Sequence, residues 1–226
     1  MHIEPGVVDG AKLALSYVTA AGAIGYAAKL ALDTIKVDGI VPLAVRSVIA
    51  TVLVFCFFQV FPHYPVGVSE VHLILGTTLF LIFGAGPAAI GLALGLLTQG
   101  LFFVPADLPQ YGMNVTTLLV PLLAVSAMAR RTIPASTAYK DVTYGQCLAL
   151  STAYQGGVVL WVAFWAFYGQ GFGVENLAKV GTFGAAYMTV IIIEPLLDLI
   201  ILAAAKGLHH LEGSKVFHPR FHRAAA

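Results

Sequence analysis

The sequence predicts an all-α membrane protein, a polytopic helix bundle with about seven hydrophobic segments, one of them short. Apolar residues make up 59% of the 226-residue chain and charged residues only 10%, whereas a soluble domain carries about 25% charged residues. The uncharged stretches are also long, because residues 73–104 and 143–173 contain no Asp, Glu, Lys or Arg. A run of about 18 or more apolar residues is typical of a membrane-spanning helix. The chain is therefore expected to cross a bilayer repeatedly.

The third hydrophobic segment, residues 71–83, is too short for a full crossing, which needs about 20 residues. We expect it to enter the membrane partway and to pack against other helices, because irregular backbone is not tolerated in contact with lipid. The predicted segments are residues 10–34, 39–61, 71–83, 86–104, 113–129, 143–169 and 178–205.

The distribution of Lys and Arg predicts which helix ends face the cytoplasm. With the N-terminus outside, the outer loops 62–70, 105–112 and 170–177 contain no Lys or Arg. Only Lys12 and Lys179 depart from the pattern, and long side chains near helix ends can snorkel to the interface. The inner ends then carry Lys29, Lys36, Arg130, Arg131, Lys140, Lys206, Lys215, Arg220 and Arg223. The prediction is an outside N-terminus and a cytoplasmic C-terminus.

Charge and motif content limit the class of function. A net charge of +1 argues against nucleic acid as a partner. The sequence has no P-loop or other nucleotide motif, so active transport would require a partner that hydrolyses ATP. The GxxxG element of Gly91 and Gly95 allows close approach of helices, either inside the bundle or at a docking face.

The first residues offer a specific chelate for a metal ion. The amine of Met1, the amide nitrogen of His2 and the His2 imidazole can close fused rings around one ion, and the imidazole of His72 would complete a ring of four nitrogens. Such donors suit Ni(II), Co(II) or Cu(II) rather than Mg(II) or Ca(II). The predicted orientation puts these groups on the same, outer side, and His63 lies in the same loop as His72. The alternatives are a frayed terminus, a hydrogen-bonded interfacial His72 and a solvated His63.

Two uncharged polar residues can serve either the metal site or the packing of the helices. Asn114 can orient an imidazole or a chain terminus by hydrogen bonding, or it can be a helix N-cap. Gln99 lies in an uncharged segment, where a polar side chain normally bonds to a neighbouring helix.

Charged residues inside predicted spans are functional candidates. Here they are Arg46, Glu194 and Asp198, and the two acids share one helical face because they are four residues apart. They form either a second cation site or proton relay, or a salt bridge with Arg46. The tail at 208–226, rich in His and Arg, favours a cytoplasmic anchor at the lipid surface, with metal buffering as the alternative.

Taken together, these motifs resemble the CbiM/NikM family, the substrate-binding membrane components (S components) of energy-coupling factor transporters for cobalt and nickel. The resemblance covers most of the chain and is strongest over residues 1–10 and 62–121. Its elements are Met1-His2-Ile3 with Glu4-Pro5-Gly6, Pro65-Val66 followed by His72, Gly86-Pro87-Ala88-Ala89, Gln99-Gly100-Leu101-Phe102, Gly112-Met113-Asn114 and the late acid Glu194.

The resemblance implies that Ni(II) or Co(II), the transported substrate, is held by the Met1 amine, the amide nitrogen and imidazole of His2, and the imidazole of His72. It also implies a prokaryotic inner membrane, a transmembrane scaffold (T) subunit, a pair of ATPases and often a small accessory membrane protein. The sequence departs from the family at Glu70, because the loop before the second histidine is usually rich in Gly, Ser and Thr. This carboxylate can alter metal preference or add a ligand.

We therefore expect a metal-binding membrane component of an ATP-driven uptake transporter, which is not itself an enzyme. Residues 1–207 would form one transmembrane domain with an N-terminal metal-binding segment. The alternatives are a structural or accessory subunit of a larger complex, and a passive channel or secondary carrier that uses Glu194 and Asp198.

Overall fold

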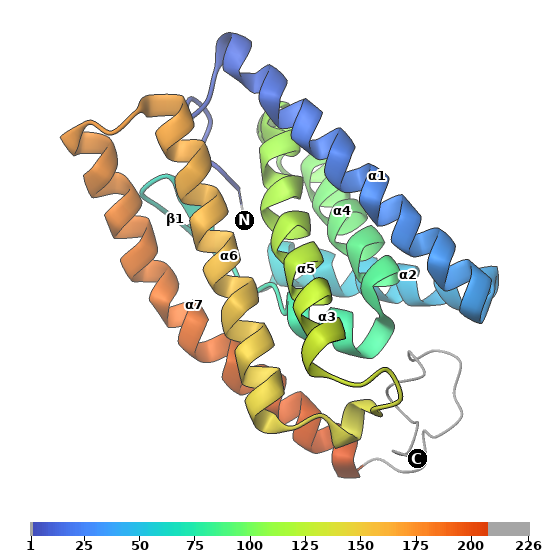
Figure 1. Ribbon diagram of the computed structural model, residues 1–226. Coiled ribbons are helices and arrows are strands. Elements are labelled where there is room, and N and C mark those ends of the chain that lie inside the picture. Colours follow the sequence, from blue (N-terminus) through green and yellow to red (C-terminus); the bar gives the residue numbers. More distant parts are fainter. Residues whose placement is uncertain (1, 208–226) are drawn as a thin grey trace.

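The computed structural model describes residues 2–207 and is a helix bundle with one small β-hairpin (Figure 1). Six of its helical stretches are long and apolar enough to cross a membrane, which confirms the all-α polytopic fold. Which end of the bundle faces the cytoplasm stays a prediction. Met1 and the tail at 208–226 lie outside the described residues. The elements are η1 (Gly10–Lys12), α1 (Leu13–Asp38), α2 (Ile40–Phe55), η2 (Cys56–Val60), β1 (Tyr64–Val66), β2 (Ser69–Val71), α3 (Gly76–Phe83), α4 (Ala85–Phe102), η3 (Pro105–Gln110), α5 (Tyr111–Thr132), η4 (Tyr139–Asp141), α6 (Tyr144–Gln170) and α7 (Val174–Gly207).

Local sequence explains where several helices begin and end. Gly39 separates α1 from α2 with φ of 92°, and Gly84 separates α3 from α4 with φ of 93°. Glycine adopts this left-handed region without the penalty that a Cβ brings. At the start of α6, Thr143 and Gln146 form a reciprocal capping box, which satisfies amide groups that the first helical turn leaves free.

The short third segment is buried inside the bundle. All eight residues of α3 are buried, which confirms the prediction of a partial segment packed against other helices. The segment begins later than predicted, because residues 69–71 belong to β2 and the helix begins at Gly76. The hairpin of β1 and β2 was not predicted. Its strands pair antiparallel and turn at Gly67, which has φ of 66°, as tight hairpin turns require.

The GxxxG element of α4 packs inside the bundle against α2. A Cβ added at Gly91 would overlap Ala50, and one at Gly95 would overlap Val54. The bare backbone therefore lets the two helices approach closely, as small residues do at membrane helix interfaces. Of the two roles left open for this element, internal packing is the one observed.

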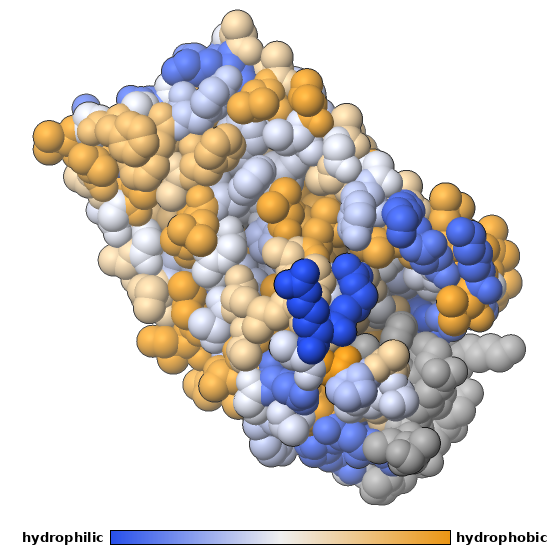
Figure 2. Space-filling model, viewed as in Figure 1, coloured by the Kyte–Doolittle hydropathy of each residue, from blue (hydrophilic) through white to orange (hydrophobic). Residues whose placement is uncertain are grey.

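The outer faces of the bundle are apolar, as a lipid environment requires. Figure 2 shows apolar side chains over much of the visible face, with hydrophilic side chains in patches at the top, at the right and in the lower half. Large apolar residues are exposed on several helices, including Val18 on α1, Val48 on α2 and Ile192 on α7. In contrast, α5 lies at the centre, and most of its spanning stretch is buried. These faces match the hydrocarbon layer of a bilayer.

Replacing Gly91 by Leu is expected to destabilise the bundle by about 1–3 kcal/mol, because the new side chain overlaps α2. The matched control is Gly22→Leu on α1, where a Cβ would have no atom within 4 Å. Thermal unfolding of the two variants in detergent micelles measures the difference. Equal unfolding temperatures for both variants would contradict this account of the α2–α4 interface.

Candidate metal centre

The N-terminal segment runs into the bundle and pairs with the hairpin (Figure 1), so that His2 is buried among the helices. Ile3 forms an antiparallel bridge with Ser69. The backbone carbonyl of His2 accepts two hydrogen bonds, from the Glu70 amide at 2.9 Å and from the Ser69 hydroxyl at 2.8 Å. On the other side, the Ile3 amide donates to Asn114 Oδ1 of α5 at 2.8 Å. These contacts fix the backbone at His2 between β2 and α5.

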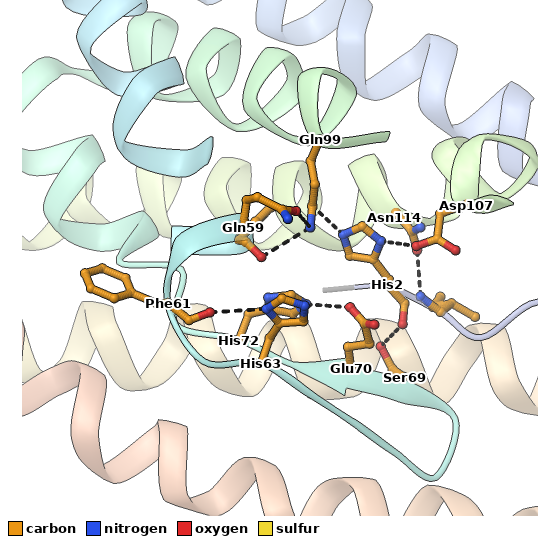
Figure 3. A network of polar contacts seen from close by, with 12 residues as sticks. His2, Gln59, Phe61, His63, Ser69, Glu70, His72, Gln99, Asp107 and Asn114 are labelled. Atoms are coloured by element: carbon orange, nitrogen blue, oxygen red, sulfur yellow. Dashed lines mark hydrogen bonds and ion pairs between the residues drawn. The ribbon is translucent and has the colours of Figure 1, made fainter. Parts of the chain in front are cut away.

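The His2 ring is buried, with 3% of the residue exposed, and both its nitrogens face oxygen acceptors (Figure 3). Nε2 lies 2.7 Å from Gln99 Oε1, and Nδ1 lies against Asp107 Oδ2. The Gln99 amide nitrogen donates to the backbone carbonyl of Phe58 at 3.2 Å, which fixes the amide so that its oxygen points at His2. Gln99 thereby keeps a hydrogen on Nε2, so Nδ1 is the ring nitrogen that can exchange its contact with Asp107 for another partner.

The His72 ring lies beside His2 in the same buried space. The ring centroids are 5.4 Å apart, and His72 is 1% exposed. Its Nε2 lies 2.8 Å from Glu70 Oε2. Because a carboxylate of this kind accepts, Nε2 carries the hydrogen, and Nδ1 has no hydrogen-bond partner among the described residues. Burial, with a contribution from the neighbouring imidazoles of His2 and His63, holds the pKa of His72 below its usual range, so the ring is neutral near pH 7.

This arrangement has the donor chemistry of a transition-metal site. One ligand atom from each of His2, Glu70 and His72 lies within 4.8 Å of the others, and imidazole nitrogen with a carboxylate suits first-row divalent metals. The surroundings are acidic: burial, then the charges of Glu70 and Asp107, raise the pKa of Glu4. A negative potential of this kind attracts cations to the site.

Most of the residues singled out in the sequence converge on this centre. His2, His63, Glu70, His72, Gln99 and Asn114 all belong to one network (Figure 3). The N-cap interpretation of Asn114 is wrong, because Gln110 caps α5 and Asn114 lies inside the helix. Gln99 was expected to bond between helices, and it does so through His2 and through the carbonyl of Phe58.

Two members of the network were missed in the sequence. Asp107, on η3, holds His2 Nδ1, and Gln59, on the π-helical turns η2, accepts from Gln99 at 3.3 Å. Asp107 could have been found from the sequence, because it is the acid in an outer loop without Lys or Arg. The sequence did not point to Gln59, because its position depends on the π-helical extension of α2, a feature common near functional sites.

Glu194 of α7 holds the turn that follows His72. Its carboxylate accepts the backbone amides of Ile74 and of Leu75, the latter at 2.9 Å, and the side-chain amide of Gln155. Leu75 has φ of 52°, a left-handed conformation that is unfavourable for a bulky residue. Glu194 therefore stabilises the strained turn between the site and α3.

The contacts observed for the intramembrane charges differ from the salt bridge that one alternative proposed. Asp198, one turn after Glu194, accepts from the Thr78 hydroxyl of α3, and Arg46 forms an ion pair of 2.5 Å with Asp38 at the end of α1. The salt bridge suggested for Arg46 is thus made within the α1–α2 corner. Both acids instead join α7 to α3 and to the turn before it.

Glu194→Gln is expected to destabilise the fold by about 1–3 kcal/mol, because the new amide group cannot accept all the donors that surround it. Denaturant unfolding in micelles measures the change. The control is Glu175→Gln, since Glu175 is an exposed acid of the same helix that pairs with Lys179, and surface pairs contribute little. If both variants unfolded alike, Glu194 would not stabilise this turn.

A family model described as "Cobalt uptake substrate-specific transmembrane region" matches residues 2–210. Two crystal structures share the fold at 17% sequence identity, each over 93% of this chain. One, of a transition metal transporter, has a TM-score of 0.72 over 94% of its own chain. The other, of a truncated transition metal transporter, has a TM-score of 0.68 over 99% of its chain. No curated protein sequence matches.

Proposed function

Because this chain belongs to the CbiM family of cobalt-uptake transmembrane regions, we propose that it captures Ni(II) or Co(II) and delivers it across the membrane with the help of partner subunits. The observation that carries this proposal is the meeting of two buried imidazoles, His2 and His72, brought together from 70 residues apart in the sequence. A buried polar group normally has a hydrogen-bond partner. Within residues 2–207, Nδ1 of His72 has no hydrogen-bond partner, and we infer that it is a ligand atom.

The proposed ligands are the Met1 amine, the amide nitrogen and Nδ1 of His2, and an imidazole nitrogen of His72. Nδ1 is the ring nitrogen that closes a chelate ring with the His2 amide, and Gln99 keeps the hydrogen on Nε2 as this ligation requires. The metal then replaces Asp107 at Nδ1. The proposal requires a free amine at Met1.

This ligand set selects the substrate by its nitrogen donors. Imidazole, amine and deprotonated amide nitrogens arranged in a plane favour Ni(II), Co(II) or Cu(II), and they leave no oxygen shell for Mg(II) or Ca(II). Glu70, hydrogen-bonded to His72, either orients that ring or adds a carboxylate ligand. The metal is the substrate and undergoes no covalent chemistry here, so the chain acts as a transport component and not as an enzyme.

Energy for transport is proposed to come from partners. The chain has no nucleotide-binding motif, so an ATPase pair would drive release through a transmembrane scaffold subunit, with a small accessory membrane protein as a further partner. The basic inner loops orient the metal centre outward in a prokaryotic inner membrane. Uptake would then proceed from the outside inward.

His2→Ala is expected to abolish binding of Ni(II), and His72→Ala is expected to weaken it by at least about 100-fold, because each removes a ligand. Isothermal calorimetry on the full-length, untagged protein measures both. The control is Asp9→Asn, an exposed residue of the same N-terminal segment. Nickel affinity of His2→Ala equal to that of the parent would falsify the proposed ligand set.

Acetylation of the N-terminus separates this function from that of a structural or accessory subunit. Only metal binding through the Met1 amine predicts that acetylation removes binding while the fold is kept.

A passive carrier that uses Glu194 predicts a different pattern, in which uptake by cells lacking any ATPase partner is stopped by Glu194→Gln.

Metal affinity is expected to fall as the pH is lowered, because protons compete for the same nitrogens. The Met1 amine must lose a proton to bind the metal, and the His2 amide must lose one as well. Since burial lowers the pKa of His72, this ring competes with protons only at lower pH than an exposed histidine. We expect release of at least about two protons per metal near pH 7, measured by calorimetry in buffers of different ionisation enthalpy. Binding without proton release would contradict chelation by amine and amide.

A further inference from the structure

We propose that His63 is an outer ligand that receives the divalent metal first and hands it to the buried His2–His72 pair. The inference rests on the proposed function and adds a residue to it. His63 lies at the start of the hairpin, between η2 and β1, and its neighbours in the network are Phe61 and His72 (Figure 3).

The hydrogen bonding of His63 prepares its Nε2 to bind metal. Nδ1 lies 3.2 Å from the backbone carbonyl oxygen of Phe61. A carbonyl oxygen only accepts, so Nδ1 carries the hydrogen and Nε2 keeps a free lone pair. A ring N–H donated to a backbone carbonyl is the usual support of a metal-ligating histidine, because it fixes both the tautomer and the orientation of the ring.

His63 lies between solvent and the buried His72 ring. Its ring stacks on the His72 ring, with centroids 4.9 Å apart and planes at 12°. His63 is half-buried, whereas His72 is fully buried. A metal ion that comes from solvent therefore meets His63 before it meets the ring stacked beneath.

His63 lies outside the cluster of ligand atoms formed by His2, Glu70 and His72. Within residues 2–207, the ligand atoms that lie within 4.8 Å of one another come from His2, Glu70 and His72. Glu70, with 22% of its side chain exposed and an oxygen on His72 Nε2, extends from this group towards the surface. His63 and Glu70 thus offer an imidazole and a carboxylate on the way to the buried rings.

A ligand that only hands over the metal has a distinct kinetic effect. It lowers the barrier between solvent and the buried site, so it speeds binding and release by the same factor. The dissociation constant, which is their ratio, is then unchanged. A ligand of the final site would instead change the dissociation constant, and a merely structural loop residue would change neither rate.

The test is stopped-flow binding and release of Ni(II) with full-length, untagged His63→Phe in micelles. Phenylalanine keeps a flat ring to stack on His72 and removes the nitrogen lone pair. We expect association and dissociation both to slow by about tenfold, with a dissociation constant within about twofold of the parent. Tyr64→Phe, which alters the exposed neighbour of His63, is the matched control and should retain parental rates. If His63→Phe unfolds, His63→Gln replaces it.

The outcomes separate this inference from the proposed function. Parental rates in His63→Phe, together with tight binding by the parent protein, would overturn the role of His63 and leave the metal centre in place. A raised dissociation constant with a parental association rate would also overturn it, because His63 would then belong to the final ligand shell. Absence of metal binding by the parent protein would instead refute the proposed function itself.

Discussion

The pairing of the N-terminal segment with β2 is the interaction on which the proposed metal centre depends. Without the Ile3–Ser69 bridge and the two hydrogen bonds to the His2 carbonyl, His2 would belong to a free chain end, and chain ends are usually mobile. With them, an imidazole from the start of the chain lies 5.4 Å from one that follows the hairpin. Backbone pairing thus converts two distant histidines into one site.

Side chains of α4, α5 and α7 hold the paired segments in place. Asn114 of the central helix α5 binds the Ile3 amide, and Gln99 of α4 binds the His2 ring. From α7, Glu194 fixes the turn after His72, and Asp198 ties Thr78 of α3 to the same helix. Movement of α7 relative to α3 would therefore be transmitted to the turn that follows His72.

The sequence was sufficient to predict the fold and to single out most of the residues that meet around His2 and His72. Spans follow from apolar runs, and His2, His72 and Asn114 stand out because polar residues are rare in so apolar a chain. The β-hairpin was missed because three-residue strands between helices carry too little period-two pattern to detect. Asp107 and the ion pair of Arg46 with Asp38 depend on tertiary approach, which residue spacing does not encode.

X-ray absorption spectroscopy of the full-length, untagged protein loaded with one equivalent of Ni(II) identifies the ligand atoms of the proposed site. We expect a planar nickel ion bound by nitrogen, with a spectrum that changes to that of free hydrated nickel when the N-terminus is acetylated. This result would tie the metal to the chain end that β2 holds in the bundle. An oxygen-rich, six-coordinate nickel ion, or a spectrum unaffected by acetylation, would contradict it.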